Sequence, residues 1–111
     1  MSTSTIKREK PRALRARVTR VALVVDLTDG RTVTVPLSWY PRLKHGTTRE
    51  RARWRRIARG EGLHWPDLDE DVSVENLLAG VRSRESRRSY ARWRATHALL
   101  RRAARTRHRK N

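Results

Sequence analysis

The chain has no cysteine, and its 111 residues contain no long apolar run. Without thiols it forms neither disulfide bonds nor cysteine-ligated zinc sites, which fits a reducing compartment. The longest aliphatic run, VALVV at residues 21–25, is far shorter than the ~20 residues of a membrane span or the ~7–15 of a signal-peptide core. We therefore expect a soluble, cytoplasmic protein that does not cross a membrane.

Acidic residues are scarce at both ends of the chain. Residues 1–20 carry seven Lys and Arg against one acid, and residues 82–111 carry twelve against one. Residues 21–81 carry nine of each sign, so the two ends hold all of the net charge of +17. Basic arms on a neutral body indicate contact with a polyanion, which would be nucleic acid, an anionic surface or an acidic protein. The alternative is a basic surface that is merely solvated.

The alternation of side chains predicts a β-hairpin. Val21, Leu23, Val25 and Leu27 point to one side, and a second alternating run, TVTV, precedes Pro36. Between the runs lies Asp-Gly at residues 29–30, the usual signal for a two-residue type I′ turn. Pro36 would end the return strand because it lacks an N–H donor.

Three helices are predicted after the hairpin. The first covers residues 47–60, where Thr47 and Glu50 have capping-box spacing and Gly60 closes the helix. The second begins at Ser73 and ends at Gly80, and the third spans about residues 86–106. The short segment 62–65 is expected to add a third strand to the hairpin.

These elements predict an α+β fold, with a small antiparallel sheet packed by one or two short helices. We assign residues 1–16 to a disordered basic arm, 17–81 to the folded domain, and 82–111 to a basic helical extension. The oligomeric state stays open.

Two segments carry a family likeness. DGRTVTVPLSWYPRL, followed by RARWRRIARGEGLHWPDLDEDVSVENLLAG, resembles the bacterial family called domain of unknown function 2442, over residues 18 to about 80. The resemblance implies a small α+β domain and no established activity. Some members look like parts of two-gene toxin–antitoxin modules, and some longer members carry a helix-turn-helix domain. The extension here reads as one basic helix, so the resemblance does not imply specific operator binding.

The segment LHWPDLDED, residues 63–71, concentrates the acids of the chain. As a metal or hydrolytic site it would use His64, Asp67, Asp69, Glu70 and Asp71. A calcium loop would need glycine where Val72 stands. We therefore expect no metal, no cofactor and no catalytic residues, and we keep a metal-dependent hydrolase as the least favoured alternative.

The acids instead suit a structural role. Residues 69–71 precede the Ser73 cap, near the positive end of a helix dipole. We also expect the loop to pair with arginines of the predicted 47–60 helix.

Four tryptophans and two tyrosines complete the candidate list. Trp54 and Trp65 are predicted to be core residues. Rings interleaved with arginine on the last helix, Tyr90 and Trp93, would also suit stacking on single-stranded bases. The candidate partner surface consists of Trp39, Tyr40, Tyr90, Trp93 and Leu100.

The sequence thus favours a binding module that is not an enzyme, antitoxin-like or regulatory, with a protein partner encoded by an adjacent gene. Its basic arms would contact DNA or RNA through phosphates, with little reading of bases. The arginines predicted to do so are Arg87, Arg88, Arg92, Arg94, Arg101, Arg102 and Arg105. The competing interpretation is a protein-interaction domain with no nucleic-acid role.

Overall fold

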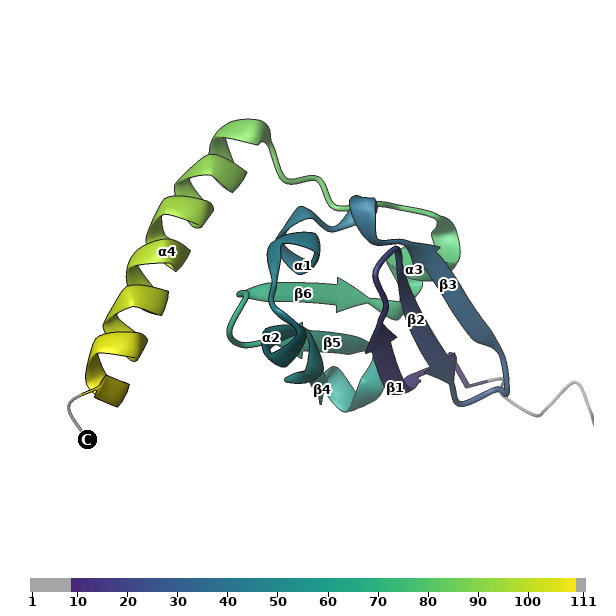
Figure 1. The fold of residues 1–111 in the computed structure, drawn as a ribbon. Helices are drawn as coiled ribbons and strands as arrows, with labels where there is room; N and C mark the ends of the chain where they lie inside the picture. The colour runs from purple at the N-terminus through teal and green to yellow at the C-terminus, as the bar shows by residue number, and fades with distance from the viewer. Residues whose placement is uncertain (1–8, 110–111) are drawn as a thin grey trace, which may run out of the picture.

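The computed structural model describes residues 9–109, with side chains to Arg105, as two three-stranded antiparallel sheets, several short helices and one long helix (Figure 1). The predicted α+β class is confirmed. In chain order the elements are β1 Ala13–Val18, β2 Ala22–Leu27, β3 Thr32–Pro36, η2 Leu37–Trp39, α1 Pro41–His45, α2 Thr48–Ala52, β4 Arg55–Ile57, η3 Ala58–Gly60, β5 Gly62–Trp65, β6 Glu70–Ser73, α3 Val74–Ala79 and α4 Arg87–Arg109.

The predicted hairpin is confirmed as β2 and β3, which pair from Ala22 opposite Pro36 to Asp26 opposite Thr32. Its turn differs from the predicted type. Gly30 N–H donates to Leu27 O, Leu27 N–H donates to Arg31 O, and of the Asp-Gly pair only Gly30 has a positive φ, 90°. This is a three-residue loop closed by a left-handed glycine, a common alternative to the two-residue turn.

The disordered arm predicted for residues 1–16 overlaps a strand. Residues 13–16 belong to β1, which pairs with β2 along one edge of the first sheet. Ala13 and Ala16 are buried because their small side chains face the core. The alternation that marks a half-buried strand is broken here, because a register shift between Ala13 and Arg15 leaves the buried Ala13 and Ala16 three positions apart instead of two. Residues 1–8 of the predicted arm lie outside the described residues.

The second sheet, β4-β5-β6, corrects two predictions. Segment 62–65 is a strand, but β1 and not this segment completes the hairpin sheet. The predicted 47–60 helix has its capping box, yet it ends at Ala52, and Arg55 then pairs with His64 in β5. Gly60 is the last residue of η3, with φ of 88°, and does not terminate the helix that begins at Thr48.

The core lies between the two sheets. Leu23, Val25 and Leu27 of β2 are buried as predicted, while Val21 is 75% exposed because it precedes the strand. Trp65 is fully buried, as predicted, and its indole N–H donates to Arg51 O at 2.9 Å. Each fully buried leucine or valine side chain in this core contributes about 1.5–3 kcal/mol.

The last two helices follow β6. Ser73 caps α3 by accepting the Asn76 N–H, and Gly80 ends it in the left-handed region, both as predicted. A linker then leads to α4, which stands beside α1 and α2 at one side of the body (Figure 1). Within residues 9–109, no helix has the length and apolar character that crossing a bilayer requires.

Candidate nucleic-acid interface

Helix α4 is the most basic element of the chain. Its 23 residues include nine arginines and no acid. Ser86 starts it by accepting the Ser89 N–H at 3.0 Å. Arginines at this density repel one another, so the helix gains from nearby carboxylates. Two anchors join it to the body, one through Glu85 at its start and one through Glu50 of α2.

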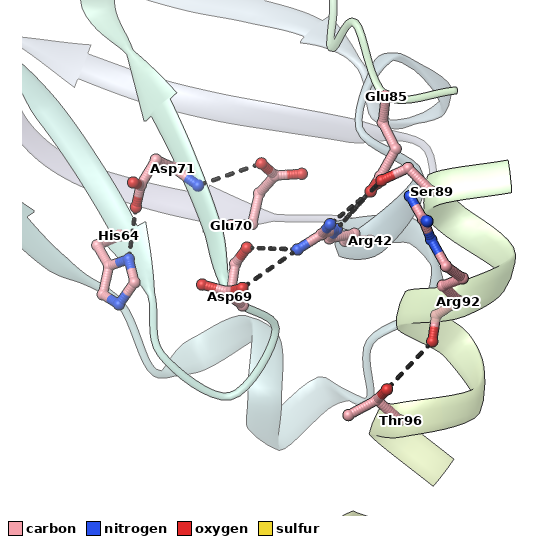
Figure 2. A network of polar contacts seen from close by, with 9 residues as sticks. All are labelled: Arg42, His64, Asp69, Glu70, Asp71, Glu85, Ser89, Arg92 and Thr96. Carbon is pink, nitrogen blue, oxygen red and sulfur yellow. Dashed lines mark hydrogen bonds and ion pairs between the residues drawn. The ribbon is translucent and has the colours of Figure 1, made fainter. Parts of the chain in front are cut away.

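The first anchor joins α1 to the start of α4 through Arg42. Its Nε donates to Glu85 Oε1 at 2.9 Å, and its Nη1 donates to Asp69 O at 2.8 Å (Figure 2). Ser89 Oγ also donates to Glu85, at 2.9 Å. The hydrogen bonds from Arg42, chiefly, lower the pKa of Glu85, whose side chain is only 8% exposed. Glu85 therefore stays ionised and ties the helix entry to the body.

The second anchor joins α2 to the middle of α4 through Glu50. One carboxylate oxygen accepts the Thr47 N–H at 2.8 Å, and the other bonds His97 Nε2 at 2.8 Å. Arg101 also donates to this carboxylate. Burial alone would raise the pKa of Glu50, but the hydrogen bonds from Arg101 and Thr47 lower it to about 2. One side chain thus caps α2 and holds α4.

Aromatic rings fill the space between the two anchors. The Trp93 ring lies 4.7 Å from His97 and 5.9 Å from Tyr90, both stacked, and 5.5 Å from His45, edge-on. The Arg42 guanidinium lies 5.2 Å from its centroid. Burial, then Arg101, lowers the pKa of His45, which favours its neutral form. We call these stacked rings and the residues of α1 that they meet the seam. Because Trp93 contacts His45 and Arg42 across it, α4 folds back on the body.

The seam changes the expected partner surface. Tyr40 is 4% exposed, and burial, then the Glu70 charge, raises its pKa to about 12, so it is a core residue. Trp39 packs against the core under the Arg82 guanidinium. Trp93 faces the body, where it meets His45 and Arg42, and Tyr90 is half-buried beside it. Leu100 alone of the predicted set is largely exposed, at 62%.

The predicted phosphate-binding arginines have different environments. Arg101 belongs to the second anchor, and Arg94 lies 5.8 Å from the Tyr90 ring. Five more are exposed: Arg87, Arg88, Arg92, Arg102 and Arg105.

Of those five, four carry positive charge that the described chain leaves uncompensated. Arg87, Arg88, Arg92 and Arg105 make no ion pair within the described part of the chain. Arg88 and Arg92, four residues apart, share one helix face.

The acids of residues 67–71 contact different partners and do not converge on one site. Arg53 donates to both carboxylate oxygens of Asp67 at 2.8 Å, which confirms a pair with the predicted helix segment. Asp69 contacts Arg42, and Asp71 contacts His64 Nδ1 (Figure 2). Residues 70–73 are a strand, so these acids do not form the helix entry that was expected. No group of three His, Asp or Glu among the described residues is placed to hold a metal.

Glu70 differs from its neighbours. One carboxyl oxygen accepts the Asp71 N–H at 3.1 Å, and the other is buried without a hydrogen-bond partner in the described structure. Burial raises its pKa to about 7, although Arg42 acts in the opposite direction. Unlike Glu50, it is a buried acid without a paired cation.

The anchor residues Arg42, Glu50, Glu85 and His97 were not foreseen as a group. The sequence places Glu50 only in a capping box and His97 only on an apolar stripe. Their contact spans 47 positions, and local periodicity carries no information at that range. The one signal available in the sequence was that Glu50 and Glu85 are single acids within clusters of arginine.

Comparisons with known proteins agree with this fold. A family described as "Protein of unknown function (DUF2442)" matches residues 13–83. A crystal structure of a protein of unknown function from Rhodospirillum rubrum ATCC 11170 superposes with a TM-score of 0.60 and 32% identity. The match covers 69% of this chain and 95% of that one. Among curated proteins no match was found.

Proposed function

Since the chain belongs to the DUF2442 family of proteins of unknown function, we propose that it is a binding module without catalytic activity, whose helix α4 contacts nucleic-acid phosphates. The observation that supports this is the exposed side of α4, where Arg87, Arg88, Arg92 and Arg105 have no carboxylate partner in the described structure. Unpaired guanidinium groups on a held helix can each displace a counterion from a phosphate.

The two anchors support the same proposal energetically. A free helix with nine arginines would lose conformational entropy on binding, whereas α4 is already held at Glu85 and at Glu50. Preorganisation reduces the cost of association. The body thus supplies a rigid support for a cationic rod.

The contact is proposed to be independent of base sequence. The exposed arginines of α4 lie on more than one side of the helix, so they do not form a single reading face. Backbone contacts of this kind position a protein on a nucleic acid without specifying a sequence.

The test is a titration of the full chain with labelled DNA and RNA at 50 and 200 mM salt. Four phosphate contacts predict an affinity loss of about a hundredfold over that interval. The helix variant R88Q/R92Q/R105Q should bind much more weakly, while the body variant R49Q/R55Q/R56Q, of equal charge, should bind nearly as the wild type does. Absence of binding at 50 mM, or equal losses in both variants, would refute the proposal.

A second candidate function is docking of a protein partner, as the antitoxin-like or regulatory member of a two-gene module. Leu99 and Leu100 support it, since both are exposed on α4, at 64% and 62%. Co-expression with the protein encoded by the adjacent reading frame tests it. L99Q/L100Q should then abolish co-purification, whereas the helix variant should not. Co-purification that survives L99Q/L100Q would count against this surface.

A further inference from the structure

A groove of about 430 Å³ lies on the body, between the end of β1 and α2. Ala16, Arg17 and Arg20 line one wall, and Thr48 and Trp54 line the other. The groove is separate from the anchors of α4, since Glu50 of α2 bonds His97 and does not line it. Its size suits a single nucleotide.

Trp54 has the environment of a ring that can accept a stacking partner. It was predicted to be a core residue, but it is only partly buried and packs at the rim of the core. Trp93 is flanked by three rings and a guanidinium, and Trp65 is fully buried. No ring or cation within the described residues covers Trp54.

The charges around the groove all have one sign. Arg17 and Arg20 are exposed and make no ion pair with the described residues, and no acid lines the groove. A third arginine, Arg51, is fixed by its hydrogen bonds to the carbonyl oxygens of Leu43 and Lys44. These carbonyls are neutral, so its charge is not compensated by a carboxylate.

From these observations we propose that the groove binds an unpaired base of a single-stranded nucleic acid, stacked on Trp54, with the flanking phosphates on Arg17 and Arg20. An aromatic ring among arginines is the usual platform for single strands. The inference rests on the proposed function, because α4 then supplies contacts to the rest of the strand. Helix α2 contacts β1 on one side and α4 on the other, so both sites border one element (Figure 1).

In this proposal Trp54 takes the stacking role that was predicted for Tyr90 and Trp93. Trp93 already contacts His45 and Arg42 of the body, and the Tyr90 ring stacks on Trp93. Trp54 lies instead on the segment that was predicted to be helix and that leads into β4. Ending α2 at Ala52 is what places Trp54 beside β1.

The experiment measures binding of a 15-nucleotide oligo(dT) and of a duplex of equal length to wild type, W54L and W54F. Loss of one stacked base predicts an affinity about tenfold lower for W54L on oligo(dT) and unchanged on the duplex. W54F, which keeps a ring, should retain most of the affinity. Equal binding of oligo(dT) by W54L and wild type would overturn the inference.

Two further arms complete the design. Should W54L fail to fold, R17Q/R20Q replaces it, with R55Q/R56Q as the control of equal charge. Free thymidine monophosphate should compete only weakly with oligo(dT). If it binds as tightly as oligo(dT), the groove binds a free nucleotide and not a nucleic-acid strand. If W54L loses binding while R88Q/R92Q/R105Q does not, the groove stands and the function proposed for α4 fails.

Discussion

Glu50 and Glu70 are both partly buried, yet their surroundings shift their pKa values in opposite directions. Glu50 meets Arg101 and His97, and its pKa falls to about 2. Glu70 has one backbone N–H and a buried oxygen without a partner, and its pKa rises to about 7. Burial raises the pKa of a carboxyl group, and hydrogen bonds from cations lower it. The hydrogen bonds together are the larger effect at Glu50, and burial is the larger one at Glu70. The two residues therefore make opposite predictions for stability.

Glu70→Gln is expected to stabilise the protein at pH 8. The folded pKa of Glu70 lies above its ordinary value of 4.5, so ionisation costs stability as the pH rises from about 4.5 through 7. The amide oxygen of Gln can still accept the Asp71 N–H. Urea unfolding should show a gain of about 1–3 kcal/mol at pH 8 and little at pH 4.5. The same change at both values would contradict this account of Glu70.

At the scale of elements, the residues that cap or end a helix were predicted correctly from neighbouring residues in the sequence. The Thr47–Glu50 capping box, the Ser73 cap and the Gly80 terminator all hold. The segment after Ala52 was predicted wrongly because its apolar spacing suits a helix, although it pairs with β5 as a strand from Arg55 opposite His64 to Ile57 opposite Gly62. Strand β1 pairs with β2 across a short turn, and it was missed because a register shift between Ala13 and Arg15 breaks the alternation of its buried residues.

Glu50→Gln should loosen α4 from the body. The folded pKa of Glu50 lies below its ordinary value, so its stabilisation is present above pH 4.5 and is lost as the pH falls toward 2. Losing the charged hydrogen bonds to Arg101 and His97 predicts a cost of about 1.5–3 kcal/mol at pH 7. Amide hydrogen exchange should speed up along α4 more than in β2.

The matched control is Glu61→Gln, because Glu61 is exposed and its side chain has no ion pair in the described structure. Its unfolding should follow the wild type between pH 7 and pH 3. Glu50→Gln should flatten that dependence. Unchanged exchange along α4 in Glu50→Gln would show that the helix is held by other contacts.

On the scale of the whole molecule, the charge is distributed unevenly along the chain. The acids of residues 21–81 equal its bases in number, and some of them hold α4 and Arg42. The sequence predicted the basic helix and its exposed arginines, since net charge needs no tertiary information. It did not predict that Arg101 pairs with Glu50 or that Trp93 contacts His45 and Arg42 of the body. Those roles depend on contacts more than 40 positions apart.

The most direct test of the central claim is the slope of log affinity against log salt concentration, measured on duplex DNA. Each phosphate contact contributes about 0.9 to that slope. If α4 makes the contacts, R88Q/R92Q/R105Q should lower the slope by about 2–3 relative to the wild type, and R49Q/R55Q/R56Q should leave it nearly unchanged. Parallel lines for the wild type and R88Q/R92Q/R105Q would contradict the claim that α4 binds phosphates.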